Sequence, residues 1–256
     1  MRLNKVNKIF NLILPLLTIL GIILVWFWGA VIVGEPIILP SPIDTLGEMF
    51  SLFVSGAFWI NLLGTIWRSL IAFCVSFVLG LGFAILIKFS NVSKPIIKLI
   101  ISIIRAMPTI AVILLLLLWT NSKVASVVVT MLVVLPTMFS SMQEALNKID
   151  KDIIDMMKIY NISKKDMFLK YILPIILPSI IRSIGTGLAL NIKLIVAAEV
   201  IAGTANSIGN MMSEAKIYFE TAELFAIVVF MIILSVVIEL VFARIANKVG
   251  GKYESE

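Results

Sequence analysis

The sequence predicts an all-α, polytopic membrane protein with six transmembrane helices and both termini in the cytoplasm. Hydrophobic residues make up 61% of the 256 residues and charged residues 14%, whereas soluble proteins average about 45–50% and about 25%. The mean hydropathy is +1.11, and the apolar residues form several long stretches rather than one. These observations exclude a water-soluble globular fold and favour a single transmembrane domain over residues 1–256.

Six apolar stretches have the length of membrane-spanning helices, which need roughly 20 residues to cross about 30 Å of hydrocarbon. They cover residues 10–33, 62–87, 96–119, 124–141, 175–203 and 224–241. The first is longer than the apolar core of a cleavable signal peptide, which has about 7–15 residues. We therefore expect it to remain as a transmembrane helix.

The basic residues orient these spans, because cytoplasmic connections retain Lys and Arg. With the N-terminus inside, the cytoplasmic segments hold 15 of the 21 Lys and Arg residues. The outer side would hold only Arg68, Lys123 and Lys216. This asymmetry predicts cytoplasmic termini, and it explains the net charge of +6 without a nucleic-acid partner.

Several kinds of chemistry are excluded by missing residue types. The chain contains no histidine, so it has no histidine general base and lacks the commonest metal ligand. Cys74 is the single cysteine and lies in an apolar run, which rules out an internal disulfide or a cysteine metal cluster and predicts a core thiol. No G-x-x-x-x-G-K-[ST] loop is present, so any ATPase must be another chain. We expect no metal site and no enzymatic activity.

Two outer connections are long enough to carry structure. Residues 34–61 contain the turn Leu39-Pro40-Ser41-Pro42 and then an amphipathic pattern with Leu46, Met49, Phe50 and Phe53, which predicts a helix at the membrane interface. Residues 204–221 begin with a turn around Asn206–Asn210 and continue as a short helix.

The connection at 144–172 is the largest cytoplasmic segment, and it predicts two short helices. Asp150 or Asp152 caps the first helix, and Asn161 ends it in a left-handed conformation. The segment from Ser163 to Asp166 is a capping box that starts the second helix.

The first of these helices carries an apolar stripe of Ile153, Met156, Met157 and Tyr160. A helix this short needs a surface to pack against. That surface is either the protein's own membrane domain and the lipid headgroups, or a groove on a cytoplasmic partner.

This segment resembles the cytoplasmic signature of the permease subunits of bacterial ABC importers. That signature is Glu-Ala-Ala, three residues, Gly, nine residues and Ile-x-Leu-Pro. Here the same spacing holds Asp155-Met156-Met157, then Asn161, then Tyr171-Ile172-Leu173-Pro174. Asp replaces the acidic Glu and Asn replaces the turn-forming Gly, while the Leu-Pro pair is unchanged. Two methionines replace the alanines.

Other segments resemble the nitrate, sulfonate, taurine and thiamine-precursor branch of that family. They are Ile38-Leu39-Pro40-Ser41-Pro42, Arg105-Ala106-Met107-Pro108, Ala197-Ala198-Glu199-Val200-Ile201 and Ser207-Ile208-Gly209. Their shared order and spacing cover roughly residues 38–245.

The resemblance implies a type I ABC importer (MetI-like) transmembrane domain in the bacterial cytoplasmic membrane. Two copies would pair, ATPase subunits holding ATP and magnesium would dock on residues 152–170, and an extracytoplasmic binding protein would cover residues 34–61 and 204–221. No cofactor is implied on this chain. The residues implied in ATPase coupling are Asp152, Ile153, Asp155, Met156, Met157, Tyr160, Asn161 and Ser163.

Ionisable residues inside spans are candidates for a solute pathway, because an unpartnered charge in a bilayer is unfavourable by several kcal/mol. At 100° per residue, Arg182, Thr186 and Lys193 share one helical face. Glu199 lies about 120° from Lys193, so it should meet another helix or a second copy. The pathway candidates are Arg182, Thr186, Lys193, Glu199 and Arg105.

The alternative for these charges is interhelical pairing, above all for Arg105 and Arg182. The excess of basic residues in the spans favours an anionic solute. Pro174 and Pro178 mark the beginning of the fifth span, where a missing N–H is tolerated or bends the helix.

Two other functions fit part of the pattern. An ion-coupled carrier would use Glu199, Lys193 and Arg182 as a relay, and a membrane-embedded enzyme would use Glu199 and Glu239 as acids. Neither explains the stripe at 153–160. The solute stays open between sulfonate, taurine, nitrate, bicarbonate and thiamine precursors.

Overall fold

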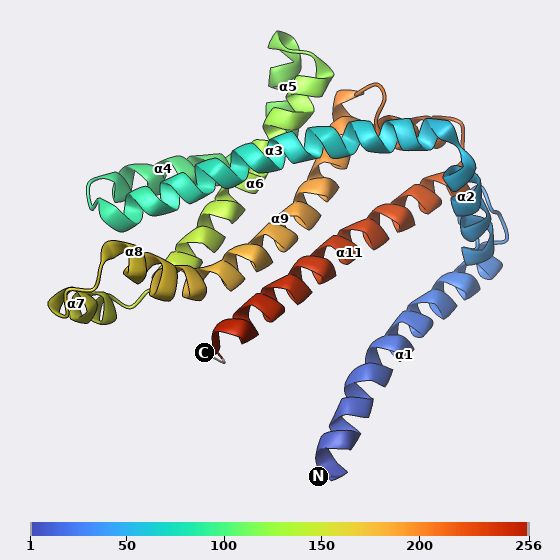
Figure 1. Cartoon of the computed structure of the whole chain (residues 1–256). Helices are drawn as coiled ribbons and strands as arrows, with labels where there is room; N and C mark the ends of the chain where they lie inside the picture. Colours follow the sequence, from blue (N-terminus) through green and yellow to red (C-terminus); the bar gives the residue numbers. More distant parts are fainter. Residues whose placement is uncertain (1, 255–256) are drawn as a thin grey trace. The chain divides into compact units, whose positions relative to one another are not determined.

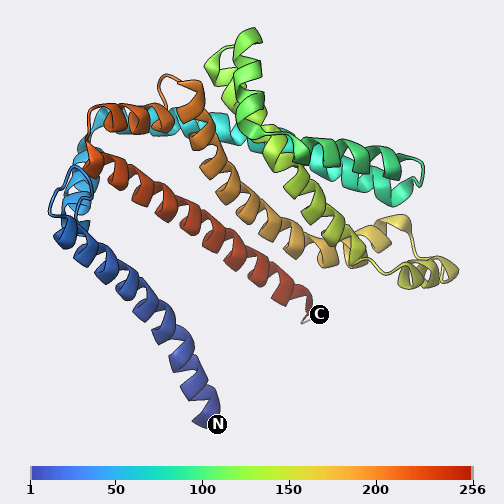
Figure 2. The same cartoon turned by 180° about the vertical axis from the view of Figure 1, so that it is seen from behind.

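The computed structural model describes the backbone of residues 2–254 and the side chains of residues 13–88 and 90–251. Arg2, Lys5, Lys8 and Lys252, which contributed to the orientation argument, lie outside the described side chains. Across residues 2–254 the regular elements are all helical (Figures 1 and 2). They are α1 (Arg2–Val33), α2 (Pro42–Val54), α3 (Gly56–Phe89), α4 (Ser93–Ala106), α5 (Thr109–Trp119), α6 (Ser122–Asn147), α7 (Lys151–Ile159), α8 (Lys164–Met167), the π-helix η1 (Phe168–Ile172), α9 (Leu173–Ala202), α10 (Ile208–Ile217) and α11 (Thr221–Glu254).

Among the described residues, five helical segments are long and apolar enough to cross a membrane, and a sixth span arises if α4 and α5 are taken together. The five are Ile13–Val33, Gly56–Lys88, Ser122–Asn147, Lys164–Ala202 and Thr221–Gly251. The pair α4 and α5 bends by 92°, so the stretch expected as the third span is divided. The break lies at Met107, which is extended (φ −68°, ψ 125°) because the ring of Pro108 disfavours the helical region for the residue before it.

The contacts divide the chain into two compact units, residues 1–59 with 211–230 and residues 60–210 with 231–256. In the first unit, the α2 helix begins with a capping box. The Ser41 Oγ accepts from the Asp44 N–H (3.2 Å), and the Asp44 carboxylate accepts from the Ser41 N–H (3.1 Å). The helix buries Thr45 and Leu52. Leu46 and Phe50 of the expected apolar stripe are exposed, which suits a helix lying against lipid.

Aromatic side chains hold the first unit together. Trp26 donates its indole N–H to the Pro40 carbonyl (3.0 Å) and its ring lies 5.6 Å from that of Phe225. The rings of Phe53 and Phe58 both pack edge-on against Phe230. These contacts tie the C-terminal end of α1, α2 and the beginning of α11 to one another.

The second unit is built around α6 and α9, which lie side by side in both views (Figures 1 and 2). One apolar cluster of this unit joins side chains of α3, α4, α6 and α9, including Ala84, Ile101, Phe139, Met142 and Ile176. Cys74, which we expected in the core, is exposed on α3. The expectation was wrong because positions facing lipid and positions facing the core of a membrane helix are equally apolar.

The cytoplasmic connection has the expected caps. Asp150 caps α7 through the Asp152 N–H (2.9 Å), Asn161 is left-handed (φ 53°) and Ser163 caps α8 through the Asp166 N–H (3.1 Å). The second helix runs into Ile172-Leu173-Pro174, as the sequence predicts. It passes through η1 into α9 as one helical run, and the wider π-turn immediately precedes Pro174, whose missing N–H interrupts the α-helical ladder.

The close approach of α3 to α6 yields a stability prediction. A Cβ on Gly80 would lie 2.9 Å from the Phe139 backbone nitrogen, whereas a Cβ on Gly82 has nothing within 4 Å. We expect Gly80→Ala to lower the free energy of unfolding by about 1–3 kcal/mol, because the helices must move apart. The measurement is denaturant unfolding in detergent, with Gly82→Ala as the matched control. Equal stability of the two variants would show that the helices do not touch here.

Candidate functional site

The face of α9 that carries Arg182, Thr186 and Lys193 is exposed, as the helical spacing predicts. Ala189, near the same line, is buried (3% exposed). Arg182 donates to the Asn247 Oδ1 on α11. Lys193 makes no ion pair or side-chain hydrogen bond with any described residue, so its ammonium group is free on this face.

Arg105 lies elsewhere, in the last turn of α4. Its guanidinium donates to the Ser140 Oγ (2.7 Å) and to the Pro136 carbonyl (3.4 Å), both on α6. This is an interhelical contact, the alternative that the sequence left open for Arg105. Pro174 stands in the first turn of α9 and Pro178 one turn further on, inside the helix.

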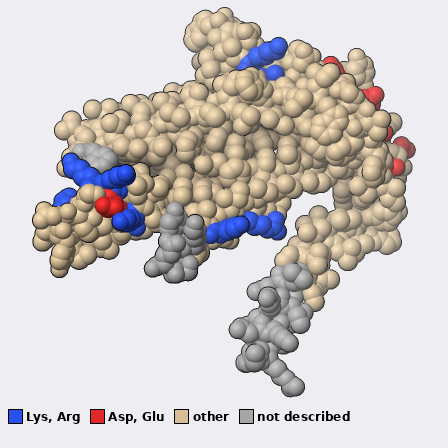
Figure 3. Space-filling model, viewed as in Figure 1, with Lys and Arg blue, Asp and Glu red and all other residues tan. Residues whose placement is uncertain are grey.

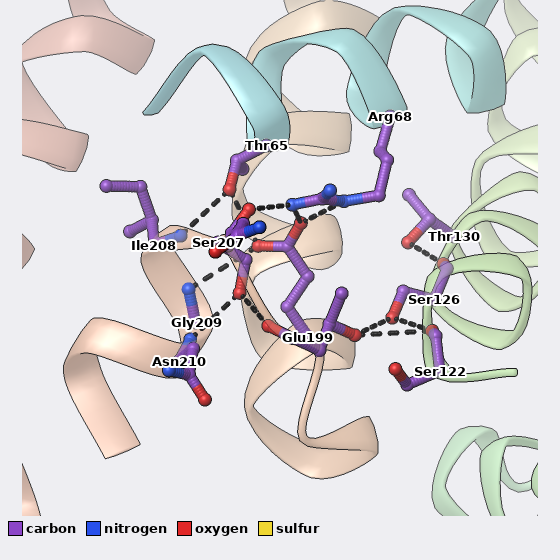
Figure 4. A network of polar contacts seen from close by, with 12 residues as sticks. Thr65, Arg68, Ser122, Ser126, Thr130, Glu199, Ser207, Ile208, Gly209 and Asn210 are labelled. Atoms are coloured by element: carbon purple, nitrogen blue, oxygen red, sulfur yellow. Dashed lines mark hydrogen bonds and ion pairs between the residues drawn. The ribbon is translucent and has the colours of Figure 1, made fainter. Parts of the chain in front are cut away.

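Glu199 meets another helix, as expected, and is completely buried (0% exposed). Arg68 of α3 donates its Nε–H to the Glu199 Oε1 (2.7 Å), and its Nη2 lies 2.7 Å from the same oxygen. The second carboxylate oxygen accepts from the Thr65 hydroxyl (2.8 Å) and the Gly209 N–H (3.4 Å) (Figure 4). Each oxygen of this buried carboxylate thus has a partner, and Glu199 does not belong to the open face with Lys193.

Arg68 is the partner that sequence reasoning did not identify. We assigned it to the outer side without a partner, and in the structure it is buried within α3 (8% exposed). Its Nη2 also donates to the Asn206 carbonyl (3.0 Å). The signal was present in the sequence, because Arg68 lies inside the second span and Glu199 needed a cation on another helix.

The turn between α9 and α10 wraps around this ion pair. Gly203 ends α9 in a left-handed conformation (φ 60°), and Thr204 shares a 2.8 Å hydrogen bond with Ser126 of α6. Gly64 and Gly209 permit the close approach: a Cβ on Gly64 would lie 2.6 Å from the Asn206 carbonyl oxygen, and one on Gly209 would lie 2.5 Å from the Glu199 Cβ. The ion pair therefore joins α3, α9 and this turn, and the hydrogen bond between Thr204 and Ser126 adds α6 (Figure 4).

The α7 helix stands out from the second unit with no fully buried residue. Ile154 packs against the core cluster, and Met157 is partly covered. Ile153, Met156 and Tyr160 are 37%, 51% and 74% exposed. Ile154, which lies outside the apolar stripe, therefore anchors the helix, while Ile153, Met156 and Tyr160 form an open edge.

Polar residues border the open edge of α7. Asp155 pairs with Lys158 (2.6 Å), and Asp152, Asn161 and Ser163 are exposed beside it. Basic side chains gather around α7 and α8 (Figure 3). No described residues form a group of three or more acidic or cysteine side chains that could hold a metal ion.

The sequence matches the family model of the binding-protein-dependent transport system inner membrane component over residues 76–252. Similar curated proteins include the putative aliphatic sulfonates transport permease protein SsuC of Escherichia coli, 28% identical over 72% of this chain and 70% of that protein. SsuC of Bacillus subtilis is 25% identical over 83% of this chain and 78% of its own length. The taurine transport system permease protein TauC of Escherichia coli is 23% identical, over 87% and 83%.

Solved structures share the fold. An inward-facing MetNI methionine ABC transporter chain aligns with a TM-score of 0.59 and 19% identity, over 78% of this chain and 97% of that one. A chain of an amino acid ABC transporter solved with histidines aligns with a TM-score of 0.59 and 17% identity, over 81% and 96%.

The buried ion pair yields a prediction on folding. Arg68→Met and Glu199→Gln should each lower the free energy of unfolding by about 3–5 kcal/mol, because each strands a buried partner. The double variant should lose clearly less than the sum, since neither charge is then left alone. Denaturant unfolding of the four proteins in detergent measures this cycle.

Lys98→Met removes an exposed cation of α4 and serves as the control, with an expected change within about 0.5 kcal/mol. Simple additivity of the Arg68 and Glu199 changes would contradict the pairing.

Proposed function

Because this chain belongs to the family of binding-protein-dependent transport system inner membrane components, we propose that it forms half of a translocation pathway for a small organic sulfonate or a related oxyanion. As a family member it is a multi-pass protein of the bacterial cytoplasmic membrane and a permease subunit of an ABC importer. It is a transport component and not an enzyme, and ATP hydrolysis belongs to a separate subunit.

The observation that carries the coupling part of the proposal is the open edge of α7. Ile153, Met156 and Tyr160 are exposed, although Ile154 holds the helix against its own core cluster. Exposed apolar side chains on an anchored, polar-bordered helix favour burial in a groove of a partner. Methionine supports this role, because its flexible side chain adapts to an existing surface. The partner in our proposal is the ATPase subunit.

The pathway part of the proposal rests on the exposed face of α9. Arg182, Thr186 and Lys193 lie on that face and Lys193 has no described partner. A lone cation in a membrane span is unfavourable unless it faces water or another chain. We propose that two copies of this chain pair with these faces toward a shared aqueous path, and that Lys193 attracts the anion.

The outer part of the proposal concerns the surface where a binding protein delivers the solute. In the first unit, α2 and the segment around Phe219 leave large apolar side chains exposed, among them Phe50 (73%) and Phe219 (72%). Phe219 holds a left-handed conformation (φ 59°), which is unusual for an aromatic residue. We propose that the extracytoplasmic binding protein docks here and selects the solute.

The solute class comes from the relatives. SsuC of two species and TauC are named for aliphatic sulfonates and taurine, and both are small sulfonates. A riboflavin permease of Chloroflexus aurantiacus is also similar, at 25% identity. The exposed cations of α9, Arg182 and Lys193, favour the sulfonates within this group, because a sulfonate is a permanent anion.

The contacts of Glu199 argue against an ion-coupled carrier. A relay requires a carboxylate that exchanges protons with a path, but Glu199 is enclosed by Arg68, Thr65 and Gly209. It is not on the face that carries Lys193 and Arg182.

The coupling proposal is tested by replacing Met156 with Asp. A charge at the centre of an apolar contact should weaken ATPase binding at least about tenfold. The measurement is co-purification of the ATPase with the tagged permease, followed by titration of their affinity. Val92→Asp is the matched control, because Val92 is 78% exposed in the turn between α3 and α4. An unchanged affinity for Met156→Asp would contradict docking on α7.

The pathway proposal is tested with Lys193→Met in liposomes that contain the assembled transporter. Loss of a cation that concentrates the solute should lower ATP-driven sulfonate uptake about tenfold, while the amount of assembled complex stays unchanged. Lys123→Met, which removes an exposed cation in the first turn of α6, is the control. A loss of assembly in place of uptake would show a structural role for Lys193.

A further inference from the structure

Facing surfaces of α6 and α9 line an open pocket of about 410 Å³ in the second unit. Ser141, Glu144, Ala145 and Lys148 line one wall, at positions i, i+3, i+4 and i+7. The other wall repeats this spacing with Ser179, Arg182, Ser183 and Thr186, and Pro178 lies beside them. Two helices thus present matching polar stripes to the same space.

Positive charge exceeds negative charge in this pocket. Lys148 and Arg182 line it together with a single carboxylate, that of Glu144. Among the side chains that the structure describes, none of these three takes part in an ion pair, whereas Arg68, Lys158 and Lys170 all do. Neither cation is neutralised by an ion pair, so both remain able to attract an anion.

The hydrogen-bond donors of the pocket are also largely free. Lys148 Nζ donates to the Ser179 Oγ (2.7 Å), so the Ser179 hydroxyl proton can point into the pocket. Arg182 directs one N–H to Asn247 and has five in all. An ammonium, a guanidinium and a hydroxyl that converge on one space match the several oxygens of a sulfonate or phosphate group.

The position of Lys148 shows at which end of α9 the pocket lies. Lys148 follows α6 in the cytoplasmic connection, so the pocket lies at the cytoplasmic end of the exposed face of α9. The volume is at the lower end of the range of ligand pockets, about 300–1,000 Å³, and suits a small anion with a short tail.

We propose that this pocket is an oxyanion-binding site at the cytoplasmic end of the pathway, where Lys148 and Arg182 hold a sulfonate or phosphate group. The inference rests on the proposed function for its physiological role and deepens it by adding Lys148 and Ser179. The bound oxyanion is either the transported solute before release or the headgroup of an anionic lipid. Both have the same chemistry, and the test separates them.

The test uses the full permease with its ATPase in nanodiscs of zwitterionic phosphatidylcholine. Methanesulfonate binding is measured by calorimetry for the wild type, Lys148→Gln and Arg182→Gln. Each variant removes one charge-assisted contact and should weaken binding about tenfold or more. Lys94→Gln, an exposed cation at the beginning of α4, removes the same charge outside the pocket and should leave binding unchanged. Higher salt should weaken wild-type binding.

A second arm uses nanodiscs that contain phosphatidylglycerol and measures, by native mass spectrometry, how much of that lipid stays bound. Weaker methanesulfonate binding in both pocket variants assigns the site to the solute. Lower lipid retention with no methanesulfonate binding assigns it to the headgroup. If both pocket variants match Lys94→Gln in both arms, the site does not exist.

Uptake by liposomes is measured separately for the wild type. Normal ATP-driven uptake with no effect in either arm overturns the pocket alone. Oxyanion binding without ATP-driven uptake leaves the site in place and overturns the proposed function.

Discussion

The second unit depends on one buried ion pair, between Arg68 of α3 and Glu199 of α9. Neither charge is tolerated in apolar surroundings without the other and without hydrogen bonds to its remaining polar atoms. That requirement explains the residues around them: Thr65 and the Gly209 N–H serve the carboxylate, and the Asn206 carbonyl serves the guanidinium. Gly64 and Gly209 are glycines because any side chain would hold these groups apart. The α9–α10 turn is therefore shaped by electrostatics more than by apolar packing.

The cations of the second unit fall into two groups with different consequences. Arg68 and Arg105 are committed to partners on other helices, and they fix α3 to α9 and α4 to α6. Lys148, Arg182 and Lys193 have no carboxylate partner among the described side chains, and Arg182 and Lys193 share the exposed face of α9. The paired cations hold helices together, whereas the unpaired ones are those that our proposal assigns to anion binding. The position of a charge in the sequence does not distinguish these two groups.

Much of the fold was predictable because lipid imposes simple rules on sequence. Length and hydropathy located the five long apolar helices. Local capping rules predicted Asp150 or Asp152 as the cap of α7, Asn161 as its left-handed end and Ser163 as the cap of α8, since each acts on a backbone only a few residues away. What the sequence did not show concerns long-range contacts. The exposed position of Cys74 and the burial of Arg68 depend on which helix lies next to α3, and a span that is apolar on every face carries no such information. The break before Pro108 was visible as a proline, but not as a bend of 92°.

For the candidate site, the sequence predicted which residues share a helical face but not which residues of two helices face each other. Helical periodicity put Arg182, Thr186 and Lys193 on one face, and that is where they lie. It could not show that Lys148 and Ser141 of α6 face Arg182, because this depends on the relative rotation of two helices. It also treated the stripe on α7 as one surface, although Ile154, outside the stripe, is the residue that anchors the helix.

The π-turn at Phe168–Ile172 joins α8 and α9 into one continuous helical run of 39 residues, Lys164–Ala202, which reaches from the cytoplasmic connection to the buried Glu199. The phase of the residues that follow is set by residue count: deleting one residue of α9 between Pro178 and Arg182 would rotate them by about 100° relative to α8. Arg182 and Lys193 would leave their face, and Glu199 would turn away from Arg68. The number of residues in this segment is therefore constrained as strongly as their identity.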